Sequence, residues 1–320
     1  MATFLSSVLA LVVQVSADPA AGAPRADSAA ALRANVARDS SDGRAWFDLA
    51  RALLAGASEY HRHADPDGRD TAGLRAALDS AEFAFARAAR LLAEAGARDS
   101  AGVLRVAARA ERSFLDWEQS GLAAAAASWS EGADEVRLPP LLEELGENLL
   151  RACPRGGVLL TAGPVDTYAA WYMHFGRAMR RDLVILPLTA WRADAVFRRR
   201  VTRDLKVPSP RERGGGDLPW LRMLVERHPV CASMGFERPP EIRRGLKWKA
   251  RPLLWVAGPR ADEDRVPPGE FVFAALQLGA GAHDTWLGPA LALYRRAARE
   301  IRGLCQAFGV YGLKEEVGCR

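Results

Sequence analysis

The residues best placed for chemistry lie in TAGPVDTY, which follows an apolar run that predicts a buried strand. In a parallel α/β sheet, ligands bind at the turns beyond the carboxyl ends of the strands, and this segment is such a turn. The candidate ligand-binding residues are Thr161, Gly163, Asp166 and Thr167. Asp166 could act as a general base or a metal ligand. The alternative is that Asp166 or Thr167 simply caps the helix that follows.

Two later segments repeat parts of this turn. WVAGPR, which ends at Arg260, repeats the apolar run and the Ala-Gly-Pro sequence, and AHDTWLG repeats Asp-Thr-aromatic before a helix. If the three turns meet at one edge of the sheet, they form a cleft lined by Asp166, Arg260, His283 and Asp284. Asp166 would then act as the base, assisted by Asp284, in a hydrolase or transferase acting on cell-envelope glycan. If the turns open on different faces, that interpretation fails.

A second cluster, EYHRHADPDGRD, has the side-chain types of a metal site. His-x-His can chelate from an extended backbone, and spaced aspartates in a Gly-containing loop can hold calcium. The candidate ligands are His61, His63, Asp65 and Asp67, with Glu59 and Asp70 beside them. Because the spacing matches neither an EF-hand nor a known zinc motif, a solvated loop at a helix end is the alternative.

The stretch 237–251, ERPPEIRRGLKWKAR, concentrates positive charge around Trp248. Such a patch can hold an anionic polysaccharide, a phosphate group or a phospholipid surface. The net charge is +5, but both signs are interspersed along the chain and no nucleic-acid motif accompanies them, so nucleic-acid binding is disfavoured. The sequence contains no Gly-x-Ser-x-Gly, Walker loop or His-Glu-x-x-His, and it identifies no cofactor.

The N-terminal residues predict export. An apolar run from Phe4 to Val15 leads into Val15-Ser16-Ala17, the small-x-small pattern of a signal-peptide cleavage site. We therefore expect a signal peptide over 1–17, a linker over 18–30 and a periplasmic or secreted mature chain. A cytoplasmic chain is the alternative if the apolar segment is not a signal peptide. No later apolar run is long enough for a transmembrane helix.

The four cysteines match no zinc pattern. In an oxidising compartment they permit a Cys153–Cys231 or a Cys305–Cys319 bridge, and the sequence does not decide between bridged and free states. Because Cys305 falls on the apolar stripe of a helix predicted over 286–308, we expect a buried free thiol there.

The elements that position these residues fall into two predicted domains. Residues 31–135 have helical periodicity and almost no strand signal. AWFDLARALL and AEFAFARAA resemble the two helices of a tetratricopeptide repeat; the matching residues are Trp46, Leu49, Ala50, Leu53, Ala81, Phe85 and Ala88. The segment between them is about 19 residues longer than the repeat allows. The resemblance implies helical hairpins, with Trp46 and Phe85 between the helices, that recruit a protein or peptide partner.

Residues 136–320 alternate apolar runs with helical segments, which predicts a mainly parallel α/β sheet with helices on both faces. The predicted strands are 156–163, 182–188, 251–258 and 270–278, and the predicted helices include 168–180, 191–205, 218–227 and 286–308. His174 falls inside the first of these helices beside two aromatic residues, so we expect a packed core histidine.

Within this domain, TAGPVDTYAAWY and RDLVILPL resemble the soluble domain of bacterial O-mannosyltransferase-like multi-spanning proteins. That family's pattern is approximately T-N-G-D-N-D-T-[FY]-x-L-W-Y followed by R-x-D-V-x-V. The matching residues are Thr161, Gly163, Asp166, Thr167, Tyr168, Trp171, Tyr172, Asp182 and Val184. Ala162, Pro164 and Val165 replace polar residues of the pattern, and the multi-spanning part has no counterpart here. The resemblance therefore implies a related soluble domain joined to helical repeats, and transferase activity does not follow from it.

Together these features predict an exported, soluble binding or scaffold protein. Its helical repeats would recruit a protein partner, and its α/β domain would hold a partner or an anionic glycan or phosphate ligand near Asp166. The glycan-active hydrolase or transferase is the alternative.

Overall fold

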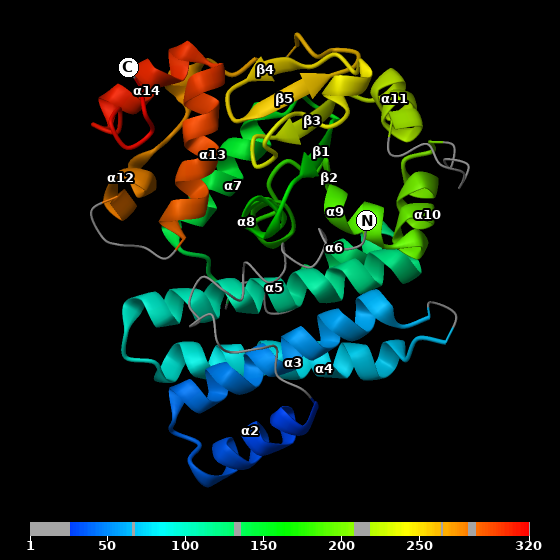
Figure 1. Ribbon diagram of the computed structural model, residues 1–320, viewed down its shortest axis with the longest axis vertical. Coiled ribbons are helices and arrows are strands. Elements are labelled where there is room, and N and C mark those ends of the chain that lie inside the picture. The colour runs from blue at the N-terminus through cyan, green and yellow to red at the C-terminus, as the bar shows by residue number, and fades with distance from the viewer. Residues whose placement is uncertain are drawn as a thin grey trace. The chain divides into compact units, whose positions relative to one another are not determined.

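The computed structural model describes residues 26–65, 68–130, 136–207, 218–263, 265–280 and 286–319 (Figure 1). The chain divides into two compact units, Met1–Pro139 and Pro140–Arg320. The predicted signal peptide and most of the linker lie outside the described residues, as do Asp67, His283 and Asp284. No helix within the described ranges is both long enough and apolar enough to cross a membrane.

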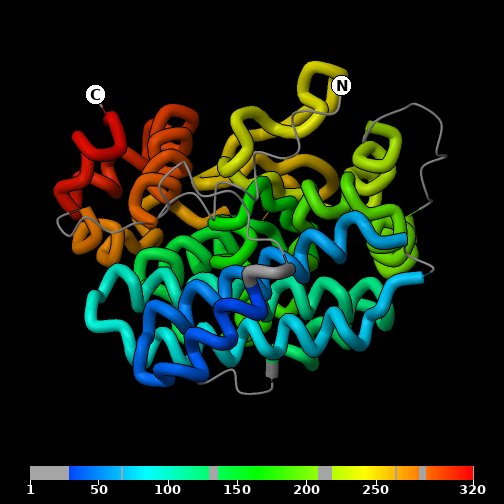
Figure 2. The backbone as a smooth tube through the Cα atoms, turned by 60° about the horizontal axis from the view of Figure 1, so that its bottom comes forward, coloured from blue at the N-terminus to red at the C-terminus, as the bar shows by residue number. Residues whose placement is uncertain are grey.

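The first unit is a stack of helices, as its periodicity predicts. Its elements are α2 (Ala26–Arg38), α3 (Gly43–His63), α4 (Thr71–Leu91), α5 (Ala95–Ser120) and α6 (Leu122–Ser130). Each helix packs against the next one along the chain, and short connections return the chain between them (Figure 2). The unit is therefore built from successive helical hairpins.

Local sequence sets the helix ends in this unit. Asp42 and Asp70 accept hydrogen bonds from the first backbone N–H groups of α3 and α4, which are otherwise unsatisfied. The helix α5 ends at Gly121, whose φ of 98° suits a residue without a Cβ. Capping residues and glycine thus fix where the hairpins turn.

Aromatic and small residues fill the space between α3 and α4. Phe47 and Phe85 meet edge to face with ring centroids 5.9 Å apart, and both are buried. Trp46 packs against the buried cluster that contains Phe85, as predicted; it also contacts Phe83 at 5.8 Å and donates its indole N–H to the Ser40 carbonyl at 3.0 Å. Phe47, which was not predicted, shares the space between the helices with them.

The extra length between the two repeat-like segments is mostly helical. The helix α3 continues to His63 and α4 begins at Thr71, so only residues 64–70 connect them. Residues 59–63, predicted as loop, form the last turn of α3. The alternative prediction of a solvated loop over 59–70 is therefore wrong for its first part, because the helical periodicity of α3 extends through the polar residues.

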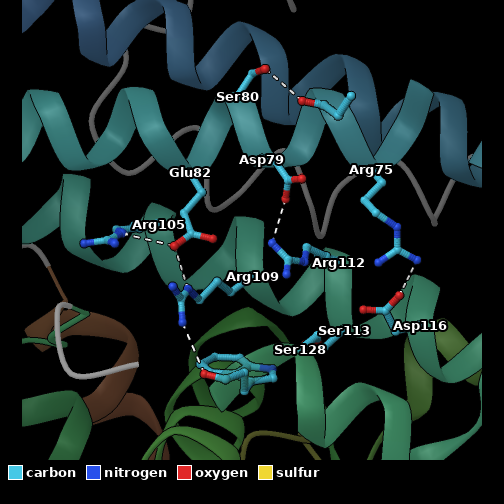
Figure 3. Close-up of polar contacts among 12 residues, drawn as sticks. Arg75, Asp79, Ser80, Glu82, Arg105, Arg109, Arg112, Ser113, Asp116 and Ser128 are labelled. Atoms are coloured by element: carbon cyan, nitrogen blue, oxygen red, sulfur yellow. Dashed lines mark hydrogen bonds and ion pairs between the residues drawn. The ribbon is translucent and has the colours of Figure 1, made fainter. Parts of the chain in front are cut away.

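A ladder of ion pairs joins α4 to α5 (Figure 3). Arg75 pairs with Asp116, Asp79 with Arg112 at 2.7 Å, and Glu82 with Arg109 at 2.6 Å. The members step by four and then three residues forward along α4 and backward along α5, which places one on each facing turn of two antiparallel helices. A shift of one helical turn would replace the three opposite-charge pairs with one opposite-charge and one like-charge pair, so the ladder favours the observed register.

The second unit contains a five-stranded mixed sheet. Its strands are β1 (Val158–Thr161), β2 (Val184–Pro187), β3 (Val230–Ser233), β4 (Lys249–Arg251) and β5 (Leu254–Ala257), in the order β2-β1-β3-β5-β4. Pairing is parallel between β1 and both β2 and β3, but antiparallel between β3 and β5 and between β5 and β4. The predicted mainly parallel arrangement therefore applies only to β2, β1 and β3.

The hairpin of β4 and β5 explains this difference. The segment 251–258, predicted as one strand, is divided by a two-residue turn in which Leu253 has a φ of 64°. A two-residue turn can join only antiparallel strands. Every residue of β1, β3 and β5 is buried, and because neighbouring side chains point to opposite faces, both faces of the sheet centre are covered.

The helices of the second unit only partly follow their predicted limits. They are α7 (Pro140–Ala152), α8 (Pro164–Trp171), α9 (Leu188–Ala193), α10 (Ala195–Asp204), α11 (Leu218–Arg227), α12 (Ala274–Ala280), α13 (Leu287–Glu300) and α14 (Arg302–Val310). The helix predicted over 218–227 is confirmed as α11. The one predicted over 191–205 is two helices, since Asp194 caps α10, and the one predicted over 168–180 ends in the π-helical turn Tyr172–Gly176.

The strand predicted over 270–278 is wrong. Its second half is the helix α12, whose first N–H groups, those of Ala275 and Leu276, donate to the Glu144 carboxylate on α7. Phe273 packs against Tyr294 and Phe308 instead of entering the sheet. A capping group distant in the sequence thus selects helix for a segment with strand-like composition.

All four cysteines form disulfides, Cys153–Cys231 and Cys305–Cys319. The free thiol expected at Cys305 is therefore wrong. The helix predicted over 286–308 breaks at Ile301, which has extended backbone angles, so Cys305 lies on the separate helix α14. Its Cα is 5.6 Å from that of Cys319, within the range that a disulfide requires.

Candidate functional site

Asp166 lies in the first turn of α8, directly after β1, and is only 3% exposed. One carboxylate oxygen accepts the Gly163 N–H and the other the Ala162 N–H, both at 2.8 Å, and the Ser233 side chain provides a further hydrogen bond. Burial raises the pKa of the Asp166 carboxyl, although these hydrogen bonds act in the opposite direction. The carboxylate is thus engaged with its own turn, which favours the capping alternative.

The remaining residues of this turn are also engaged with one another. The hydroxyl oxygens of Thr161 and Thr167 are 2.7 Å apart, and both residues are buried. Gly163 is the N-cap residue of α8. A Cβ at Gly235, after β3, would lie 2.7 Å from the Asp166 carboxylate, so the chain passes directly over it. Thr161, Gly163, Asp166 and Thr167 are therefore brought together, but as a packed turn.

Arg260 does not join them. Because β5 is antiparallel to β3, Ala257 at the end of β5 lies opposite Val230 at the start of β3. Arg260 therefore lies at the end of the sheet where β1 and β3 begin, and its guanidinium is 4.0 Å from the Cβ position of Gly156. Asp166 lies at the other end. The predicted cleft shared by these two residues is wrong, and its other members, His283 and Asp284, fall outside the described residues.

His61 is buried within the helical unit and forms ion pairs there. Its Nε2 is 2.9 Å from Glu118, and its Nδ1 is 3.7 Å from Glu111. Glu118 also accepts a hydrogen bond from Arg69 at 2.8 Å. Burial lowers the pKa of His61, but hydrogen bonding and attraction to the two glutamates outweigh it and raise that pKa to about 9. A protonated imidazole has no lone pair for a metal ion.

The other predicted metal ligands do not converge on His61. His63 lies two positions further along α3, where side chains do not face each other, and it is exposed beside Glu59. Asp65 is exposed after the end of α3, and Asp67 lies outside the described residues. The predicted chelating geometry depends on extended backbone, whereas both histidines are helical.

Asp182, part of the mannosyltransferase-like pattern, holds three segments together. It forms a two-pronged ion pair with Arg180 and accepts the Gly156 N–H at 2.9 Å. Arg180 also donates to the carbonyls of Leu150 and Cys153 at the end of α7. Hydrogen bonding from Arg180 lowers the pKa of Asp182 to about 2. These contacts are structural.

His174 is a packed histidine, as predicted. Its ring contacts Phe175 at 4.6 Å between centroids, and its Nδ1 is 3.0 Å from the Met179 carbonyl. Burial lowers the pKa of His174, which favours the neutral ring.

Two hollows flank β4. This strand lies at the edge of the sheet (Figure 1). The first has a volume of about 310 Å³ and the second of about 410 Å³. Both are lined by Lys249, Ala261 and Asp262. The first is completed by Ala152, Ala250, Arg251, Pro252, Arg265, Val266, Pro267, Pro268, Phe271 and Ile301, and the second by Lys247, Val256, Ala257, Gly258, Arg260 and Glu263. We call this surface the β4 face.

The β4 face carries an excess of positive charge. Among its described lining residues, five are lysine or arginine and two, Asp262 and Glu263, are acidic. Asp262 pairs with Lys249 and Arg265, and hydrogen bonds from these two cations lower its pKa. The side chains of all three are more than half exposed. Ligand-accessible cations are thus concentrated here.

The sequence indicated part of this surface. Its Lys247, Lys249 and Arg251 belong to the basic stretch 237–251, but Arg260 was assigned to the turn of Asp166. Asp262 and Arg265 were missed, because only the loop that follows β5 brings Asp262 to Lys249, and Arg265 in turn pairs with Asp262. The acidic run ADED, close after a basic stretch, is the one signal that would have suggested the pairing.

No family model, curated protein or solved structure matches this chain.

Proposed function

We propose that this chain is an exported binding protein whose α/β unit captures an anionic ligand on the β4 face. The observation that carries the proposal is the pair of hollows whose described linings include four exposed lysine and arginine side chains, those of Lys247, Lys249, Arg260 and Arg265. Ammonium and guanidinium groups form charge-assisted hydrogen bonds with carboxylates and phosphates, and such bonds are the strongest of their kind.

The disulfides support the export part of the proposal. Cys153–Cys231 and Cys305–Cys319 pair every cysteine of the chain. Disulfides persist in oxidising compartments such as the bacterial periplasm and the extracellular space. The signal-peptide pattern of residues 1–17 agrees with that location.

The helical unit supports a second binding surface. Its stacked hairpins α2 to α6 and the tetratricopeptide-like residues of α3 and α4 are the kind of scaffold that recruits a protein or peptide. In this proposal the helical unit holds a protein partner, while the α/β unit holds the anion. The glycan-active enzyme has less support, because its cleft needed Asp166 and Arg260 at the same end of the sheet.

Titration calorimetry of the mature chain with tripolyphosphate and with tetragalacturonate tests the anion site. We expect binding that weakens with salt, because exposed charges are screened. The double variant Lys247→Ala/Lys249→Ala should bind about tenfold more weakly, since two solvent-exposed ion pairs of at most about 1 kcal/mol each are lost. The charge-matched control is Arg199→Ala/Arg203→Ala, two exposed positions on α10. Equal weakening in both double variants would mean that net charge, and not the β4 face, attracts the anion.

A further inference from the structure

The two hollows of the β4 face are neighbours that share the ion pair of Lys249 and Asp262 in their linings. Lys249, Ala261 and Asp262 line both of them, whereas Arg265 lines only the first and Arg260 only the second. A ligand that occupies both hollows must therefore pass over the pair formed by Lys249 and Asp262. This arrangement suits an extended molecule with several anionic groups better than a single small anion.

Asp262 already places a carboxylate at the centre of this path. One of its oxygens accepts a hydrogen bond from Lys249 and the other from Arg265. The carboxylate is 52% exposed in the side chain, and its two cationic partners are 60% and 66% exposed. A carboxylate from solution can reach the same two cations, and it would form the same contacts.

The loop that carries Asp262 is held independently of any ligand. The buried Arg251 on β4 donates from one guanidinium nitrogen to the carbonyls of Ala261 and Glu263, on either side of Asp262. Arg251 is therefore a positioning residue, which keeps Asp262 in front of Lys249. The cost of exchanging Asp262 for a ligand is confined to two exposed ion pairs, and each of these is weak.

The lining also indicates the rest of the ligand. Pro252, Pro267 and Pro268 give the first hollow an apolar side that can pack against the C–H surfaces of sugar rings. Unpaired nucleobases need exposed aromatic rings for stacking, and Phe271, the aromatic residue in the described lining, is buried. A carboxylated glycan therefore fits better than a nucleic acid.

We propose, building on the anion site above, that the β4 face binds a linear glycan with repeated carboxylate groups and that Asp262 is a built-in competitor occupying the position of one of them. The ligand class is a polyuronate. Binding exchanges the ion pairs of Asp262 with Lys249 and Arg265 for ion pairs with the glycan. Short or weakly charged molecules form too few such pairs to displace Asp262, so they bind weakly.

The test compares Asp262→Asn with wild type in titrations with mono-, di- and tetragalacturonate. Removing the competing charge should tighten tetragalacturonate binding about twofold to thirtyfold, the combined value of the two exposed ion pairs that Asp262 forms. Affinity should rise steeply from the monomer to the tetramer. Glu270→Gln, an exposed position in the same unit that does not line the hollows, makes the same charge change and should match wild type. Asp262→Glu, which keeps the carboxylate, should also stay close to wild type.

Several results would overturn this inference while leaving the anion site intact. If Asp262→Asn binds tetragalacturonate no more tightly than Glu270→Gln does, Asp262 does not compete with the ligand. Tripolyphosphate or a single-stranded oligonucleotide could bind more tightly than tetragalacturonate, which would replace the ligand class. By contrast, if no anion binds and Lys247→Ala/Lys249→Ala behaves as its control, the anion site itself is refuted.

Discussion

The ion pairs of His61 make the stability of the helical unit depend on pH in a direction that can be measured. His61 on α3 lies between Glu118 and Glu111 of α5, with Arg69 also on Glu118 and the ring of Phe114 at 5.4 Å. The perturbation is deprotonation of His61, which removes its attraction to both glutamates. Glu118 would keep only its bond to Arg69.

The magnitude follows from the two pKa values. The folded-state pKa of His61 is about 9 against 6.5 for the unconstrained group, and at about 1.4 kcal/mol for each pKa unit the protonated pair contributes about 3 kcal/mol. Because the folded state binds the proton more tightly, this stability is complete below pH 6.5 and is lost as the pH rises through 9.

Hydrogen exchange of α3 and α5 measures this effect locally. We would compare wild type with His61→Gln from about pH 6 to about pH 10, using the free energy of opening of these two helices. Across that range, the difference in the free energy of opening between wild type and His61→Gln should fall by about 3 kcal/mol. His63→Gln is the matched control, since this histidine is 71% exposed on the same helix. A difference between wild type and His61→Gln that is constant with pH would show that folding does not raise the pKa of His61 and would refute the reasoning.

Three further predictions follow from other contacts. Asp79→Arg or Arg112→Asp alone should lower the free energy of unfolding by about 1 kcal/mol, and the double exchange should recover most of it, as measured by denaturant titration in a double-mutant cycle. Burial raises the pKa of Glu144 to about 7 from 4.5; the folded state therefore binds more protons between these values, and the α/β unit should lose stability as the pH rises from 4.5 to 7. A melting-temperature series with Glu144→Gln should lack that slope, and an unchanged slope would contradict this assignment. Asp166→Ala leaves two backbone N–H groups without their acceptor and should cost about 1–3 kcal/mol in thermal or chemical unfolding, whereas a variant as stable as wild type would argue against the capping role.

Periodicity and capping chemistry account for what could be predicted of the fold. The helical character of residues 31–130 and the helix at 218–227 depend on contacts three or four residues apart, which a sequence displays directly. The capping role of Asp166 could also be predicted from the sequence, because its carboxylate accepts hydrogen bonds from N–H groups at most four residues away. The helix α12 could not be predicted in this way, because its capping carboxylate comes from Glu144, far away in the chain.

The candidate site was likewise predictable only where it depends on residues close together in the sequence. The basic stretch 237–251 was visible in the sequence, because it is a property of composition. The pairing of Lys249 with Asp262 and the position of Arg260 were not, since both depend on the antiparallel return of β5. Sheet pairing joins residues of any sequence separation, and a single two-residue turn at Leu253 reverses which end of the sheet a following residue reaches.

The sequence by itself therefore determined the helical hairpins, the strand–turn–helix at Asp166 and the concentration of positive charge near β4, because each is set by residues adjacent along the chain or along one helix face. Only the tertiary structure decided that His61 is a buried ion-pair partner, that Arg260 and Asp166 lie at opposite ends of the sheet, and that Asp262 sits between two cations on the β4 face. Those outcomes depend on burial and on strand order, which arise when distant segments pack together and exclude water.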